Sequence, residues 1–242
     1  MGGVSALSFV YIALCYIATA VFIAGVTSRI YKYASTPAPL KIPTTPAPTS
    51  RAGVAGRLAG EVLFFTSLFK GNKWTWLGGY VFHAALALVL LRHLRYFLVP
   101  IPEMVALAGP PGVWAGVIMV TALAYLFLRR MSVDRVAYIS SIADYFVLSL
   151  IGLIGVTGLL MKFVIRADVA AVKGFIMGIV TFSPVQMPAD PMFIIHLSLV
   201  LILMVYFPFS KLMHAGGIFF SPTRNQVDDP RERRHVNPWA AQ

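Results

Sequence analysis

The chain has 242 residues, of which 58% are hydrophobic and only 12% are charged, and its formal net charge is +11. Its mean hydropathy is +0.78. This composition excludes an ordinary water-soluble domain. In a membrane protein Lys and Arg collect in cytoplasmic loops, so we attribute the basic charge to topology and expect no nucleic-acid partner.

Long apolar stretches are expected to form five transmembrane helices, since a bilayer takes about 20 apolar residues to cross. The first stretch lacks a basic leader and is too long for a signal peptide, so we expect a retained anchor. Aromatic residues near the predicted helix ends fit the headgroup level. The approximate cores are Ser5–Thr27, Trp76–Val99, Val113–Leu128, Ile142–Val164 and Met192–Met213.

The distribution of basic residues predicts the orientation. With the N-terminus outside, fifteen Lys and Arg residues fall on the inner side and five on the outer side, which favours a cytoplasmic C-terminus. We therefore expect a multi-pass protein of the cytoplasmic (inner) membrane. The five outer residues are Arg92, Arg95, Lys162, Arg166 and Lys173.

Three segments between the spans are expected to stay out of the bilayer core. The five prolines of Thr36–Pro48, in the inner loop 29–75, predict an extended strap. Arg57–Phe69 has apolar residues at helical spacing and predicts one amphipathic helix in the inner interface. Asp168–Ser183 is apolar, but Lys173 would lie near the middle of a span, so we expect it flat on the outer surface.

A single cysteine, Cys15, lies inside the first span and is expected to be a small buried residue. One cysteine cannot supply the four thiolates of an iron–sulfur cluster, and the chain has no Cys-x-x-Cys-His motif for attached haem. Any such cofactor is expected in a partner subunit.

Four of the five histidines lie in only two predicted spans: His83 and His93 in the second, and His196 and His214 in the fifth. At 1.5 Å per residue they are about 15 Å and about 27 Å apart along their helices. The eighteen residues from His196 to His214 make five α-helical turns, which would put both on one face. Because the helices are antiparallel, His93 is expected opposite His196, and His83 opposite His214.

These pairs predict two bis-histidine sites roughly 21 Å apart along the membrane normal. Haem iron needs only two axial nitrogens and suits an apolar helical core, here of the four-helix type. A zinc site would need three or four clustered ligands. We therefore predict two b-type haems, held by an outer pair (His93 and His196) and an inner pair (His83 and His214). A transporter or scaffold with metal-binding histidines is the alternative of another class. The sequence has no acidic cluster within the predicted spans, which counts against a transporter.

Several other side chains suit haem or quinone chemistry. Haem propionates need cations, and four arginines lie near the span ends, although snorkelling to headgroups explains them equally well. They are Arg92, Arg95, Arg129 and Arg130. Arg92, Arg95 and Glu103 also form a candidate quinone site, with Glu103 as proton acceptor. Asp144 is expected to be an end-turn anion.

Glycines and a proline mark two of the spans. Gly152, Gly155 and Gly158 are spaced for close approach by a neighbouring helix or by a flat macrocycle. Pro208 is expected to kink the fifth helix. His235, in the charged tail, is expected to be solvated.

The stretch from Phe193-Ile-Ile-His-Leu to Phe207-Pro-Phe-Ser-Lys-Leu-Met-His214 resembles the fifth helix of the gamma subunit of respiratory nitrate reductase. The ten-residue step from His83 to His93 resembles the family's second helix. The resemblance covers the five spans and implies that all four histidines are haem ligands. It also implies electron transfer between a quinone (menaquinone or ubiquinone) and a cytoplasmic iron–sulfur subunit. Val113 stands where nitrate-reductase members carry a quinone-site lysine.

The tail motifs Phe219-Phe-Ser-Pro-Thr-Arg-Asn and Arg234-His-Val-Asn-Pro-Trp239 are similar to the DsrM branch, the cytochrome b subunit of the DsrMKJOP complex of dissimilatory sulfur metabolism. This resemblance implies a DsrK-like iron–sulfur partner, periplasmic cytochrome c and iron–sulfur subunits, and a second membrane subunit. A nitrate reductase gamma subunit is the alternative. We predict a membrane dihaem domain at 1–218 and a cytoplasmic tail at 219–242. The chain would be the electron-transfer subunit of an oxidoreductase complex, with no catalysis of its own.

Overall fold

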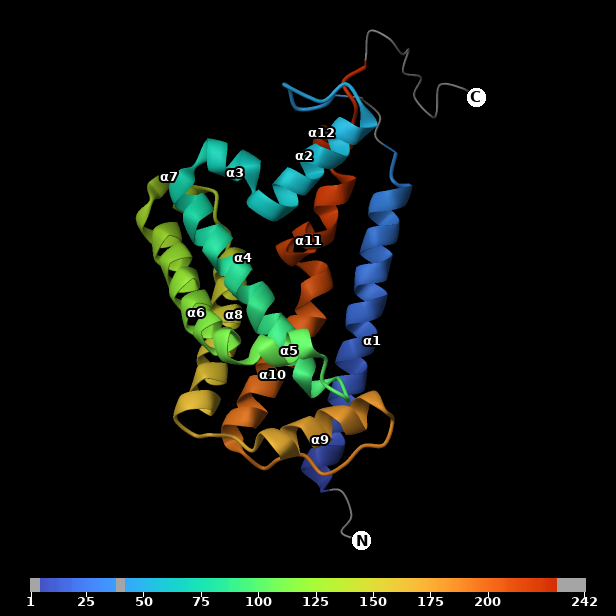
Figure 1. The fold of residues 1–242 in the computed structure, drawn as a ribbon, viewed down its shortest axis with the longest axis vertical. Coiled ribbons are helices and arrows are strands. Elements are labelled where there is room, and N and C mark those ends of the chain that lie inside the picture. Colours follow the sequence, from blue (N-terminus) through green and yellow to red (C-terminus); the bar gives the residue numbers. More distant parts are fainter. Residues whose placement is uncertain (1–4, 38–41, 230–242) are drawn as a thin grey trace. The chain divides into compact units, whose positions relative to one another are not determined.

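A computed structural model of the chain describes residues 5–37 and 42–229, and Figure 1 shows its helices. Within these residues, five helices are long and apolar enough to cross a membrane. They are α1 (Ala6–Ser35), α4 (Lys73–His93), α6 (Gly109–Ser132), α8 (Ile142–Phe163) and α10 (Pro191–Tyr206). The prediction of an all-α, five-span membrane protein is therefore confirmed, whereas the orientation of the termini stays a prediction.

Shorter helices lie between the spans and after the last one. They are α2 (Arg51–Phe64), α3 (Thr66–Gly71), α5 (Glu103–Leu107), α7 (Asp134–Tyr138), α9 (Val169–Val180), α11 (His214–Gly217) and α12 (Pro222–Asn225). The described residues divide into two compact units. The first contains residues 5–22 and 77–206, and the second contains residues 23–37, 42–76 and 207–229.

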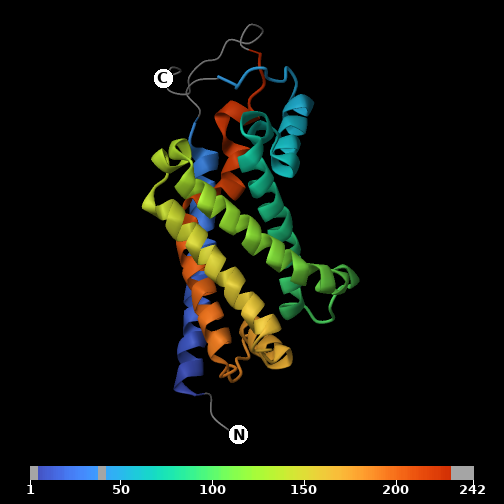
Figure 2. The same ribbon diagram turned by 90° about the vertical axis from the view of Figure 1, so that its left-hand side faces the viewer.

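Two apolar clusters form the core of the first unit. One joins α1 to α9 and α10 through Cys15, Phe175 and Leu197. The other joins α4 to α6 through Phe82 and Met119, with α8 packed beside it. Figure 2 shows α6 and α8 running side by side, and α8 also packs against α10. The helices that carry His93 and His196 thus belong to different clusters.

The glycines of α8 allow this close packing. A Cβ at Gly155 would lie 2.6 Å from Cγ2 of Val120 on α6, and a Cβ at Gly152 would touch Leu123 at 3.5 Å. Their use in helix packing is therefore observed. Gly158, one turn further along, faces His196 of α10.

Helix α9 runs crosswise to α1 and α10 (Figure 1). Its twelve residues span only about 18 Å, too short for a bilayer core of about 30 Å. Asp168 begins the helix by accepting hydrogen bonds from the backbone of Ala170 and Ala171. Phe175 anchors it, because this ring is fully buried. The segment is not a sixth span, as predicted.

In the second unit, residues 207–220 pack along the second half of α1. A Cβ at Gly25 would lie 2.6 Å from Cβ of Pro208, so only glycine fits there without a shift. Arg29 donates from Nε to the Pro208 carbonyl at 3.1 Å. Further along, the Tyr33 and Phe220 rings lie 6.2 Å apart.

The Pro-rich strap is held by the segment that follows α11. Thr44 donates its backbone N–H to the Thr223 carbonyl, and Asp228 donates to the Pro48 carbonyl, each at 2.9 Å. Arg57 of α2 donates to the Thr44 carbonyl at 2.9 Å. We call residues 42–71 and 218–229 together the strap–tail module. Residues 38–41 of the strap lie outside the described residues.

The single amphipathic helix expected over Arg57–Phe69 is wrong, because the helix breaks at Phe65. This residue adopts a left-handed conformation, with φ 51° and ψ 47°. The break leaves backbone N–H and C=O groups without partners inside the helix, and two side chains form hydrogen bonds with such groups. The Glu61 carboxylate accepts the Ser67 N–H, and the Trp76 indole donates to the Phe64 carbonyl at 2.8 Å.

The fifth helix is also shorter than expected. α10 ends at Tyr206, and two 3₁₀ turns follow at Phe207–Phe209 and Lys211–Met213. Pro208 has no N–H to continue the α-helical pattern, and the Ser210 hydroxyl caps the second turn by accepting from Leu212. The predicted interruption is confirmed. The five-turn count from His196 to His214 does not hold, because it assumed a continuous α-helix.

Candidate functional site: four histidines

Each of the four histidines is held by its Nδ1 atom. His83 donates to the Gly79 carbonyl and His93 to the Val89 carbonyl, both at 2.7 Å, and His214 donates to the Lys211 carbonyl at 2.8 Å. A carbonyl oxygen only accepts, so Nδ1 carries the proton in these rings. The lone pair therefore lies on Nε2, the atom suited to ligate a metal.

His196 reaches the same tautomer through a different partner. Its Nδ1 lies 2.9 Å from Oγ1 of Thr157 on α8. The Thr157 proton is already directed at the carbonyls of Leu153 and Ile154, at 2.8 and 3.0 Å. The hydroxyl oxygen therefore accepts from His196 Nδ1–H. Sequence reasoning missed Thr157, although a threonine beside a glycine in an apolar helix is a recognisable signal.

The first unit brings His93 and His196 together. His93 is the last residue of α4 and His196 lies in the second turn of α10, and the two rings are near enough to interact electrostatically. Both side chains are partly buried. This pair joins the two apolar clusters of the unit and has the chemistry of a bis-imidazole site.

His83 and His214 are each held locally. The His83 ring contacts Phe82 edge to face, with 5.0 Å between ring centroids. His214 begins α11, and its side chain is exposed. His83 belongs to the first unit and His214 to the second, so their pairing stays a prediction. His235 lies outside the described residues.

The predicted arginines have different surroundings. Arg92 donates from Nε to the Gly109 carbonyl at 3.1 Å and packs over Gly112. Arg130 donates to the Ser140 hydroxyl at 2.7 Å and lies 3.8 Å from Asp144. Arg92 and Arg130 thus already hold helix corners together. Arg95, in the turn after His93, has no hydrogen bond or ion pair within the described part of the chain, whereas Arg129 is not free.

Asp144 is an end-turn anion, as predicted. Its carboxylate accepts the N–H and hydroxyl of Ser141, both at 2.9 Å, and so forms a capping box at the start of α8. Glu103 is the first residue of α5 and is exposed. α5 packs against the 3₁₀ turn that follows His93, so Glu103 belongs to the same end of the unit as the His93–His196 pair.

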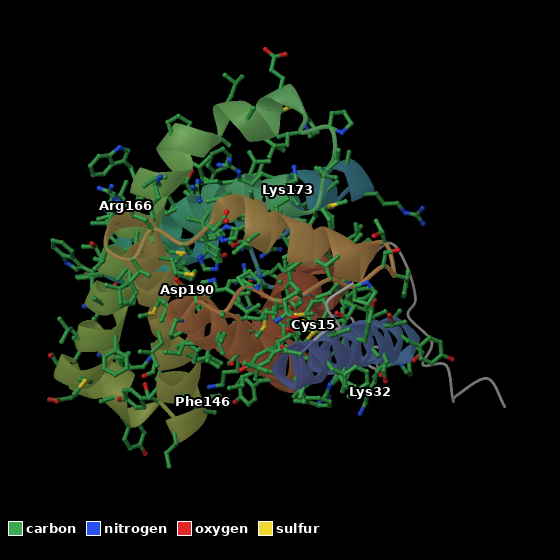
Figure 3. The ribbon with its side chains drawn as sticks, turned by 90° about the horizontal axis from the view of Figure 1, so that it is seen from below. Cys15, Lys32, Phe146, Arg166, Lys173 and Asp190 are labelled. Carbon is green, nitrogen blue, oxygen red and sulfur yellow. The ribbon has the colours of Figure 1, made fainter. Side chains whose placement is uncertain are left out.

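A lysine that the sequence did not assign to the site also reaches this end. Lys173 of α9 donates from Nζ to the Leu98 carbonyl at 3.1 Å. α9 also packs against the turn Leu94–Tyr96. Figure 3 shows Lys173 on the edge of α9, and Cys15 between α1 and α10. Only the fold shows that a residue 75 positions after Leu98 is bonded to it.

The donor set suits haem better than a clustered metal site. Within residues 5–37 and 42–229, no group of three or more His, Cys, Asp or Glu side chains is arranged to hold a metal ion. Four imidazoles with protonated Nδ1 instead match the two axial nitrogens that each b-type haem needs. Gly158 leaves room beside this ring, because a Cβ there would touch Cε1 of His196 at 3.4 Å, the atom next to Nε2.

The fold and the histidines define a multi-pass membrane protein with the donor set of a cytochrome b. Residues 65–228 match the nitrate reductase gamma subunit family, and the chain belongs to that family. Two curated relatives have the name "Hdr-like menaquinol oxidoreductase cytochrome b-like subunit". The one from Archaeoglobus fulgidus is 40% identical over 93% of this chain and 81% of its own length. The one from Archaeoglobus profundus is 36% identical over 96% and 82%.

Proposed function

We propose that this chain is the dihaem cytochrome b subunit of a membrane oxidoreductase complex and that it takes electrons from menaquinol. One observation carries the proposal: Nδ1 of each of the four histidines lies within hydrogen-bonding distance of a carbonyl or hydroxyl oxygen, which leaves Nε2 as the atom suited to bind iron. His93 and His196 would hold one haem, and His83 and His214 the other. Bound haem would supply one-electron transfer between the two membrane faces.

The names of the relatives support a quinol-linked role. Both are named as subunits of a menaquinol oxidoreductase rather than of a nitrate reductase. We therefore propose menaquinol as the substrate in preference to ubiquinol. The qualifier "Hdr-like" in both names supports a DsrK-like cytoplasmic partner, since that subunit resembles heterodisulfide reductase. A place in dissimilatory sulfur metabolism, among the other DsrMKJOP subunits, belongs to the same proposal.

Menaquinol is proposed to bind at the end of the first unit that carries His93. Its oxidation releases two electrons and two protons, so the site needs a cation or donor for the quinone oxygen and an acceptor for the protons. Arg95 and Lys173 supply positive charge there, and Glu103 is the exposed carboxylate of that end. Arg92 is less suited, because Gly109 already occupies its Nε. The apolar α9 would shelter the quinone from water.

Haem content tests the proposed function. Purified parent protein should contain two low-spin b haems per chain by pyridine haemochrome absorbance. His93→Ala and His196→Ala should each remove one and the same haem, and His83→Ala and His214→Ala should each remove the other. The fifth histidine, which lies in the charged tail, is the matched control: His235→Ala should keep both haems. A parent protein with one haem or none contradicts the proposal.

A further inference from the structure

We infer that Thr157 is a positioning residue for the ligand His196, and that its hydroxyl tunes the haem held by His93 and His196. The inference rests on the proposed function, because it concerns the setting of one proposed ligand. Thr157 is only 7% exposed and lies on α8, so its hydroxyl reaches His196 from a neighbouring helix.

This arrangement separates His196 from the other three histidines. His83, His93 and His214 donate to carbonyls three or four residues earlier in their own chain segment. Those bonds are made within a single helical turn and involve no second helix. The His196 ring is oriented by a contact between α8 and α10, so the plane of this imidazole depends on helix packing.

The Thr157 hydroxyl is itself held in place. Its proton is directed at the Leu153 and Ile154 carbonyls, and this leaves its oxygen aimed at the ring. The Ile154 carbonyl also lies near His196. Gly158, the next residue, leaves the ring edge open at Cε1. Two consecutive residues of α8 thus hold one edge of the imidazole and clear the space beside its ligating nitrogen.

A hydrogen bond from Nδ1–H makes the imidazole more electron-rich, and an electron-rich ligand stabilises ferric over ferrous iron. Loss of the Thr157 acceptor should therefore raise the midpoint potential of this haem. Mutation of the hydrogen-bond partner of a metal ligand typically costs about 10- to 100-fold in metal affinity or activity. For a one-electron couple, tenfold corresponds to about 59 mV.

The test compares three substitutions of similar size in the full-length protein. Thr157→Val removes the acceptor and keeps the shape, and Thr157→Ser keeps the hydroxyl. Thr121→Val is the matched control, because Thr121 of α6 bonds the Val117 carbonyl in the same way but its side chain is exposed. Each protein is assayed for haem content, for the midpoint potentials of both haems by optical titration, and for the low-spin ferric EPR signals.

Thr157→Val should retain two haems and shift one midpoint potential upward by about 59 mV, with a changed EPR signal for the same haem. Thr157→Ser and Thr121→Val should match the parent. Loss of that haem in Thr157→Val with its return in Thr157→Ser would also support the inference. In a His93→Ala background, Thr157→Val should leave the remaining haem unchanged.

Two results would overturn the inference while leaving the proposed function intact. One is a Thr157→Val protein with two haems and parental potentials and EPR signals, which would mean that the Ile154 carbonyl or packing alone suffices. The other is a shift in the haem that survives in His93→Ala. A parent protein without two haems would instead refute the proposed function.

Discussion

At the scale of single residues, Glu61 is a largely buried carboxylate that several partners hold. Its side chain is 10% exposed and accepts from the Ser67 hydroxyl and backbone, while Arg224 lies 3.2 Å away. Burial alone would raise the pKa of this carboxyl, but the hydrogen bonds from Ser67 and Thr66 and the Arg224 charge outweigh it. The pKa of Glu61 is therefore below its ordinary value of 4.5.

A lowered pKa predicts how the tail attachment depends on pH. The ionised carboxylate stabilises the contact fully above pH 4.5, and this contribution is lost as the pH falls through the lowered pKa. Glu61→Gln should weaken the contact at pH 7 by about 1–3 kcal/mol and remove its pH dependence. The measurement is protease cleavage within residues 221–229 in nanodiscs between pH 7 and pH 3.5.

The matched control is Asp134→Asn, since Asp134 is an exposed carboxylate at the start of α7. It should keep the parental rate of tail cleavage and the parental pH dependence. Arg224→Met should resemble Glu61→Gln at pH 7, because it removes the other half of the ion pair. Equal cleavage of parent and Glu61→Gln across the whole pH range would contradict the prediction.

At the scale of elements, the sequence predicts the spans well and their breaks poorly. Hydropathy finds all five spans. In lipid the backbone N–H and C=O groups must bond within the segment, so a long apolar stretch can cross only as a helix. The break at Phe65 is hidden because Phe65 fits the apolar helical spacing, and the groups that cap the break lie on Glu61 and Trp76. Pro208 signals the end of α10, yet the same-face count from His196 to His214 ignored it. Thr157 lies 39 residues from His196, so only packing reveals the contact.

Helix α9 is the element on which the quinone proposal makes its sharpest prediction. Lys173→Gln should slow menaquinol-driven haem reduction at least tenfold, because it removes a charge at the site. Glu103→Gln should slow it as well, by removing the proton acceptor. Stopped-flow absorbance of the haem bands measures this rate, and dithionite reduction should remain at the parental extent.

Lys162→Gln is the matched control for Lys173, because Lys162 is an exposed lysine in the last turn of α8. Its reduction rate should equal that of the parent. Menaquinol enters at the opposite membrane face if it reduces the haems of Lys173→Gln and Glu103→Gln, and the one haem left in His93→Ala, at the parental rate.

At the scale of the whole molecule, the strap–tail module is the proposed docking surface for the iron–sulfur partner. It combines the strap, α2 and α3 with the segment around Arg224, and it contains exposed basic residues such as Arg51 and Lys70. Docking here agrees with the inner position expected from the charge distribution. The Arg129–Arg130 turn belongs to the first unit, where Arg130 is bound to the α7–α8 corner.

Truncation after Gly217 should leave both haem spectra intact and abolish co-purification of the iron–sulfur subunit in mild detergent. It removes Thr223 and Asp228, the two backbone partners of the strap, together with Arg224. Arg224→Met should reduce partner recovery without abolishing it, because the two backbone bonds remain. A truncated chain that still recovers its full complex would show that the partner binds elsewhere.

The pairing of the strap with the tail also imposes an order on biosynthesis. Glu61 leaves the ribosome 163 residues before Arg224, and the four remaining spans are made in between. The Glu61 carboxylate of α2 therefore has only its Ser67 and Thr66 hydrogen bonds, and no Arg224 counter-ion, until α10 has been made. The partner can recognise a complete module only after membrane insertion has finished, so the same contact that shapes the surface would keep half-made chains out of the assembled complex.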